Sequence, residues 1–174
     1  MNEVLKAMKE RRSVRSFKPD MPDKAELEKI AEAGLYAANG RGKQAAIIIG
    51  VTDPEMRKKI VEINRKIGGW QEGFDPFYGA PVIFIVLADK ACSTYVYDGS
   101  LVLGNMMLAA HSLGLGSIWI HRAKEEFETE EYKSLLKELG IEGEWEGIGH
   151  CAVGYAQGEL PKAAERKENR VFWI

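Results

Sequence analysis

The sequence predicts an α+β domain in which about four strands are covered by helices. Apolar runs typical of buried strands follow segments of helical periodicity, in the order helix, helix, strand, helix, strand, helix, strand, helix, strand. Hydrophobic residues make up 45% of the chain and charged residues 29%, as is usual for a soluble globular protein. With 174 residues and no internal repeat, we expect residues 1–174 to form a single domain.

Capping signals and apolar spacing place the elements of the first half. Asp23 with Glu26 three residues later resembles a capping box, and Asp53 followed by Pro54 is typical of a helix start. The expected elements are helices over residues 2–12, 24–37 and 53–67 and a strand over 45–51.

The stretch from Asp98 to His121 is the predicted centre of the domain. Asp98 is a good N-cap, and the apolar residues that follow occupy more than one face, so we expect a buried helix. It is shorter than the ~20 residues that cross a bilayer, which favours a core helix. Its small residues suit close packing, either within the chain or against a second subunit. The other elements expected in this half are strands over 81–87, 117–120 and 148–155 and a helix over 129–139.

Residues 68–80 contain glycines and aromatic residues without any periodicity. Glycine gives a backbone conformational freedom, so this loop is a candidate lid in which Trp70 and Phe74 contact the substrate. The alternative, that its aromatic rings complete the core, has equal weight because aromatic side chains are usually buried.

The charged C-terminal tail ends in four apolar residues, Val171 to Ile174. Apolar side chains left in solvent are a liability, so we expect this end to dock on another surface, and a twin chain is the natural one. The tail therefore predicts a homodimer.

The net charge and the two cysteines indicate which binding partners and which cellular compartment to expect. The net charge of −2 gives no sign of a nucleic-acid or membrane partner. Cys92 and Cys151 form no CxxC motif and no signal peptide is recognisable, so a cytoplasmic location is expected. A metal site is not expected, because the adjacent His150 and Cys151 would point to opposite faces of a strand.

One cluster carries recognisable binding chemistry, the run Arg11-Arg12-Ser13-Val14-Arg15. Its guanidinium groups and hydroxyl can surround a phosphate, whereas the alternative is a solvated basic helix end. No GxSxG motif is present, and Gly42-Lys43-Gln44 lacks the Ser or Thr of a Walker A loop.

Three segments together resemble the nitroreductase family of FMN-dependent oxidoreductases: RRSVRSF, DGSLVLGNMMLAAHSLGLGSIWI, and AVGYAQGELPK followed by ERK. The resemblance covers nearly the whole chain. It implies a three-layer α/β/α sandwich around a mixed sheet of about four to five strands. It also implies an intertwined homodimer with two FMN molecules at the subunit interface.

The resemblance also implies site residues by position. Arg11, Ser13 and Arg15 would contact the FMN phosphate and the pyrimidine edge of the flavin, and the late basic residues would reach the phosphate. The family's loop with glycine and glutamine is matched only in part, at Gly40 and Gln44. The full implied cofactor set is Arg11, Arg12, Ser13, Arg15, Asn39, Gly40, Gln44, Ile120, His121, Arg166 and Lys167.

The expected activity is hydride transfer from NAD(P)H, through FMN, to an electron-poor acceptor such as a nitroaromatic or quinone. A cation near the flavin ring stabilises the reduced form, and no protein acid or base is then required. The alternatives are a flavin-dependent dehydrogenase or dehalogenase of a natural metabolite, and a non-enzymatic anion- or nucleic-acid-binding module.

Overall fold

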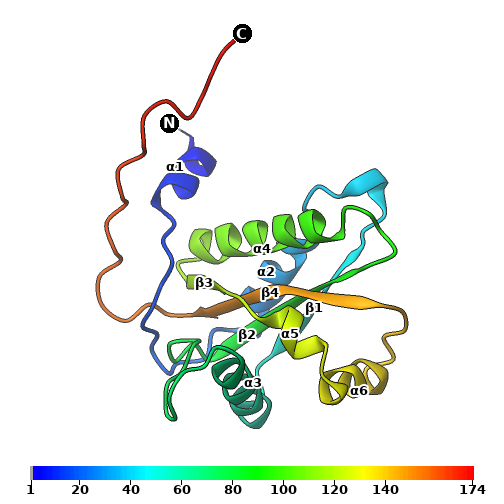
Figure 1. Cartoon of the computed structure of the whole chain (residues 1–174). Coiled ribbons are helices and arrows are strands. Elements are labelled where there is room, and N and C mark those ends of the chain that lie inside the picture. Colours follow the sequence, from blue (N-terminus) through cyan, green and yellow to red (C-terminus); the bar gives the residue numbers. More distant parts are fainter. Residues whose placement is uncertain (1) are drawn as a thin grey trace.

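The computed structural model describes residues 2–174 and has three layers (Figure 1). One four-stranded sheet lies between α2 and α4 on one face and α3, α5 and α6 on the other. The helices are α1 (Glu3–Glu10), α2 (Lys24–Leu35), α3 (Pro54–Ile67), α4 (Tyr95–Ser112), α5 (Ala123–Phe127) and α6 (Glu130–Glu138), with a 3₁₀ turn at Gly40–Gly42. The strands are β1 (Ala46–Val51), β2 (Val82–Asp89), β3 (Gly116–Ile120) and β4 (Trp145–Gly154).

The strand order is β1-β2-β4-β3, and every pair of neighbouring strands is antiparallel. The expected number of strands is confirmed, but the expected mixed sheet is wrong. The reason is the position of β4, which inserts between β2 and β3, the two strands that α4 connects. β1 and β3 are left at the two edges of the sheet.

β2 is the most buried strand, because helices cover both of its faces. Its residues from Val82 to Ala88 are at most 4% exposed, as the continuous apolar run predicts. Alternate residues of this strand point into different cores: Ile83 and Ile85 pack with α3 and α5, and Val82 and Phe84 pack with α2 and α4.

One predicted helix start and one predicted capping contact need correction. α4 begins at Tyr95, so Asp98 lies in its first turn and not at the N-cap. The side chain of Asp23 makes no capping hydrogen bond, so the expected capping box is absent from α2. Asp53 does cap α3, accepting a 2.7 Å hydrogen bond from the backbone N–H of Met56.

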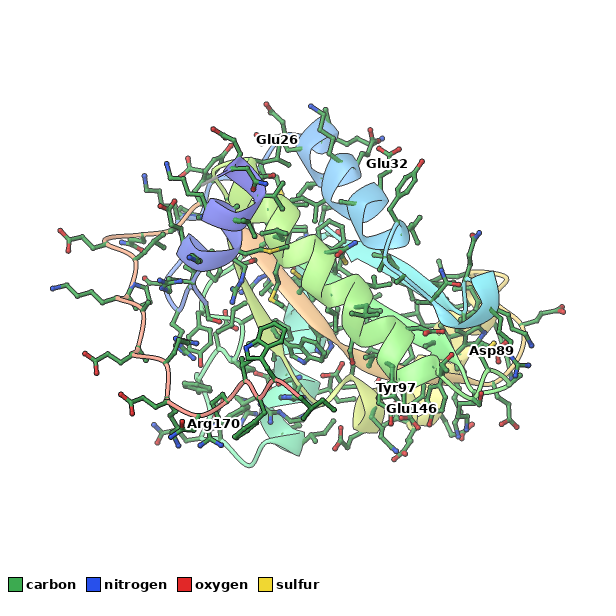
Figure 2. The ribbon with its side chains drawn as sticks, turned by 90° about the horizontal axis from the view of Figure 1, so that it is seen from above. Glu26, Glu32, Asp89, Tyr97, Glu146 and Arg170 are labelled. Carbon is green, nitrogen blue, oxygen red and sulfur yellow. The ribbon has the colours of Figure 1, made fainter. Side chains whose placement is uncertain are left out.

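α4 is buried on only one side. Val102, Leu103 and Met106 pack onto the sheet, whereas Tyr97 is 72% exposed and Leu101 is 50% exposed. Figure 2 looks down on this uncovered side and labels Tyr97 near the N-terminal end of α4. The expectation of an all-round buried helix therefore does not hold for a single chain. Among residues 2–174, no helix is both long enough and apolar enough to span a membrane.

The sequence did not predict α5, which is a single short turn of helix after β3. Its close approach to the sheet depends on Gly147 in β4, because a Cβ atom at this position would overlap the carbonyl group of Ala123. β4 also starts at Trp145, three residues before the predicted strand.

Gly147→Ala is expected to lower the free energy of unfolding by about 1–3 kcal/mol, because backbone atoms of α5 must move to admit the methyl group. Denaturant unfolding measures this. Gly50→Ala is the matched control, since its Cβ would meet Phe84 at an ordinary 3.4 Å. Equal stability of the two variants would show that α5 accommodates the change freely.

Candidate functional site

The basic cluster follows α1 and lies beside the first residues of β3. Ser13 forms an isolated parallel bridge with Ser117, in which the N–H of Val14 donates to the carbonyl of Ser117 at 3.0 Å. Val14 is buried against Gly116, where any Cβ would be only 2.8 Å from the valine side chain. These contacts fix the backbone of the cluster against an edge strand.

Part of the Arg11 guanidinium group is buried. Its Nη1 atom lacks a hydrogen-bond partner within residues 2–174. Arg11 lines a cavity of about 560 Å³ together with Ser13, Lys162 and Arg166. A buried guanidinium nitrogen without an acceptor is costly, so this cavity suits an anionic group such as a phosphate.

Arg12 has a different role, because its Nη1 donates to the carbonyls of Lys9 and Arg11 at 2.6 and 2.7 Å. It therefore holds the C-terminal end of α1, although it also borders the cavity. Arg166 lines the same cavity from the exposed tail, and Lys167 follows it in the chain without lining the cavity.

Two more of the predicted residues stand at the far end of β3. Ile120 is its last residue and His121 follows it, about 17 Å from the start of the strand at ~3.3 Å per residue. His121 is exposed and lines a cavity of about 650 Å³ with Trp119, Arg122 and Ser100. Arg15 is also exposed and lines a smaller cavity near Gln157. An elongated ligand could thus run along this edge strand.

The 39–44 loop lies away from the basic cluster, at the N-terminal end of α4. The carboxylate of Asp98 accepts hydrogen bonds from the N–H of Gly40 at 3.1 Å and from the hydroxyl of Thr94 at 3.0 Å, which fixes the loop to the N-terminal end of α4. Within the loop, the N–H of Gln44 donates to Asn39 at 2.9 Å.

Apart from Ile120 and His121, the predicted cofactor residues therefore form two groups. The 39–44 loop leads into β1 at one edge of the sheet, and residues 11–15 lie beside β3 at the other edge (Figure 1). The two groups also lie near opposite ends of α4, whose 18 residues span about 27 Å. One chain does not bring them together.

Sequence reasoning missed a buried polar network beneath the end of β3. Asn64 of α3, Glu126 of α5 and His150 of β4 are all completely buried. Nδ2 of Asn64 donates to Glu126 at 2.6 Å, and Nε2 of His150 lies 2.8 Å from the other carboxylate oxygen of Glu126. The only signal in the sequence was Asn64, a polar residue on the apolar face of a helix, at the i+4 position from Ile60.

Residues 8–155 match the sequence profile of the nitroreductase family. The chain belongs to the nitroreductase family. It is 31% identical over 164 residues to an Archaeoglobus fulgidus protein named as a candidate NADH dehydrogenase/NAD(P)H nitroreductase, covering 91% of this chain and 88% of that protein. Predicted family membership is thus confirmed.

Two further relatives bear on the cofactor. The crystal structure of a Bacteroides fragilis nitroreductase with bound FMN superposes with a TM-score of 0.91 at 27% identity and covers 100% of both chains. The FMN reductase [NAD(P)H] of Bacillus subtilis is 29% identical over 140 residues, which are 68% of this chain but only 53% of that protein.

The 68–80 loop is well anchored to the rest of the chain. Asp75 pairs with Arg57 of α3 and also accepts hydrogen bonds from the N–H groups of Phe77 and Gly79. Phe77 is completely buried and belongs to the core. The core alternative therefore holds for this ring.

Trp70 and Phe74 are only half-buried, with ring centroids 5.0 Å apart. The guanidinium of Arg122 lies 4.3 Å from the ring centroid of Trp70. This contact places Trp70 beside the turn that follows β3. The substrate role of the two rings stays a prediction.

Neither Cys92 nor Cys151 is in a disulfide, and Cys151 is fully buried. Burial raises the pKa of Cys151 to about 12, although the nearby Arg11 charge opposes the shift. The thiol is therefore protonated at neutral pH, which argues against a thiolate nucleophile at this position.

Proposed function

We propose that this nitroreductase-family chain binds FMN along β3 and transfers hydride from NADH or NADPH to an electron-poor acceptor, such as a nitroaromatic or a quinone. The observation that carries the proposal is Arg11, which lines a basic cavity and whose Nη1 is buried without an acceptor among residues 2–174. The bound FMN of the Bacteroides fragilis structure and the names of the relatives support it.

The residues present fit the cofactor at its phosphate end. Arg11, Ser13 and Arg166 surround the cavity and would bind the phosphate by charged hydrogen bonds. We assign Arg15 to the pyrimidine edge of the flavin, where its charge would stabilise the negative charge of reduced flavin. Bound flavin supplies the hydride-accepting chemistry, so the chain needs to bind and orient rather than to donate a proton.

The ring end of the site would lie beside Ile120 and His121. The neighbouring cavity is lined by Trp119 and the exposed His121, whose rings lie next to each other with centroids 5.7 Å apart and offer aromatic surface to a flat ligand. Trp70 and Phe74 stand next to this turn through the contact of Trp70 with Arg122, and we assign them to the acceptor.

A second copy of the chain would complete the site. α4 exposes Val96, Tyr97 and Leu101, and the C-terminal tail exposes its four apolar residues. If α4 packs against its twin in antiparallel orientation, the 39–44 loop of one chain approaches residues 11–15 of the other. We therefore propose a homodimer in which Asn39, Gly40 and Gln44 reach the cofactor of the partner.

Anaerobic mixing with pyridine nucleotide tests the proposed function. The purified protein should be yellow, and NADH or NADPH should remove the visible absorbance of its flavin. A nitroaromatic or quinone should then restore the absorbance. A colourless protein that FMN does not reconstitute would overturn the proposal, and reduction without reoxidation by either acceptor class would overturn the acceptor assignment.

A further inference from the structure

We propose that Asn64, Glu126 and His150 are positioning residues that fix the backbone from Ile120 to Arg122 at the ring end of the site. The inference rests on the proposed function for the location of the flavin ring. The network itself rests on contacts within the chain.

Each member of the network has its hydrogen-bonding groups satisfied. Nδ2 of Asn64 donates to Glu126 and to the carbonyl of His121, at 2.6 and 2.9 Å, and its Oδ1 accepts from Nε of Arg122 at 3.2 Å. Nδ1 of His150 lies 3.2 Å from the carbonyl of Ile120. Two consecutive carbonyls are thus held by side chains from two different elements.

The protonation of the pair follows from these partners. The carbonyl of Ile120 can only accept, so Nδ1 of His150 carries a hydrogen. The 2.8 Å contact between Nε2 of His150 and Glu126 needs one further proton, on either atom. The pair is then neutral as a whole, which is what complete burial requires.

The held carbonyls orient the outer edge of the turn. In a planar trans peptide the N–H points opposite to the preceding C=O, so the N–H groups of His121 and Arg122 point away from the network. Within residues 2–174, neither N–H donates to a protein acceptor outside the strand ladder. The chain offers these two donors on the side where His121 is exposed and lines the cavity.

Arg122 extends the network to the 68–80 loop. Its φ of 81° is left-handed, a conformation that residues other than glycine rarely adopt. Its Nε is held by Asn64 and its guanidinium lies over Trp70. Phe77 of the same loop contacts the ring of His150 edge-on, with centroids 5.2 Å apart. The network therefore fixes the position of the turn and, through Arg122, the position of the Trp70 ring that we assign to the acceptor.

The test compares Asn64→Leu with two matched variants in the FMN-loaded protein. Asn64→Leu removes the partner of both the His121 carbonyl and Arg122. Glu126→Gln keeps one acceptor for Asn64 and one donor for His150, so it should preserve the geometry. Ile60→Val lies one turn earlier on the same buried face of α3, and an aliphatic side chain there makes no hydrogen bond to either carbonyl.

In single-turnover mixing, Asn64→Leu should slow flavin reduction by roughly 100-fold, because displacement of reacting groups by about 1 Å costs that much. FMN affinity should change less than about threefold, since the phosphate contacts lie at the other end of β3. Glu126→Gln should stay within about threefold of the unmodified protein, and Ile60→Val should reduce normally. In the protein without FMN, amide exchange of residues 121–123 should accelerate in Asn64→Leu but not in Ile60→Val.

Two results would overturn the inference: reduction of Asn64→Leu at the normal rate, or the same loss in Ile60→Val, which would mean general destabilisation. If Asn64→Leu does not fold, Asn64→Ala gives the same comparison with a smaller change. A parent protein that does not bind FMN, or is not reduced by either nucleotide, would instead contradict the proposed function.

Discussion

Arg11→Ala is expected to weaken FMN binding by about 1.5–3 kcal/mol, the size of a hydrogen bond to a charged group. Each 1.4 kcal/mol is tenfold in affinity, so the dissociation constant should rise by about one to two orders of magnitude. The reason is that Arg11 lines the basic cavity and that its Nη1 is buried without an acceptor within residues 2–174. Titration of apo-protein with FMN measures the effect.

Arg12→Ala is the matched control for this prediction. Nη1 of Arg12 donates to backbone carbonyls at the end of α1, so its loss should loosen that helix end and change FMN affinity much less. Equal losses for the two variants, or unchanged affinity in Arg11→Ala, would mean that the cluster is only a basic helix end.

Deletion of Val171 to Ile174 is expected to weaken the proposed homodimer strongly. Each large apolar side chain contributes roughly 1.5–3 kcal/mol if it becomes fully buried. In the single chain they are largely exposed, Val171 at 70% and Trp173 at 92%, so most of their surface is still to be covered. Sedimentation of the full and truncated chains over a range of concentrations measures the dissociation constant.

Glu168→Ala provides the control, because it changes the same exposed tail without removing apolar surface. It should leave the association of the two chains nearly unchanged. A full-length chain that sediments as a monomer would contradict both the dimer and the completion of the site by a second 39–44 loop.

Local signals in the sequence were sufficient for features that depend on neighbouring residues. The continuous apolar run of β2 predicted a strand covered on both faces, and Asp53 predicted the start of α3. The basic cluster was also visible, because its members are consecutive in the chain. Asp98 misled the prediction, since a good N-cap residue serves equally well to bind the loop at Gly40.

The family, the basic cluster that can surround a phosphate, and the succession of helices and strands apart from α5 were predictable from the order of the residues alone. The tertiary structure decided which distant residues meet. It placed β4 between β2 and β3, and it kept the 39–44 loop apart from residues 11–15. It also brought Glu126 into contact with Asn64, 62 residues before it, and with His150, 24 residues after it. No periodicity encodes such contacts, because they form only when packing of the apolar faces fixes the relative positions of separate elements.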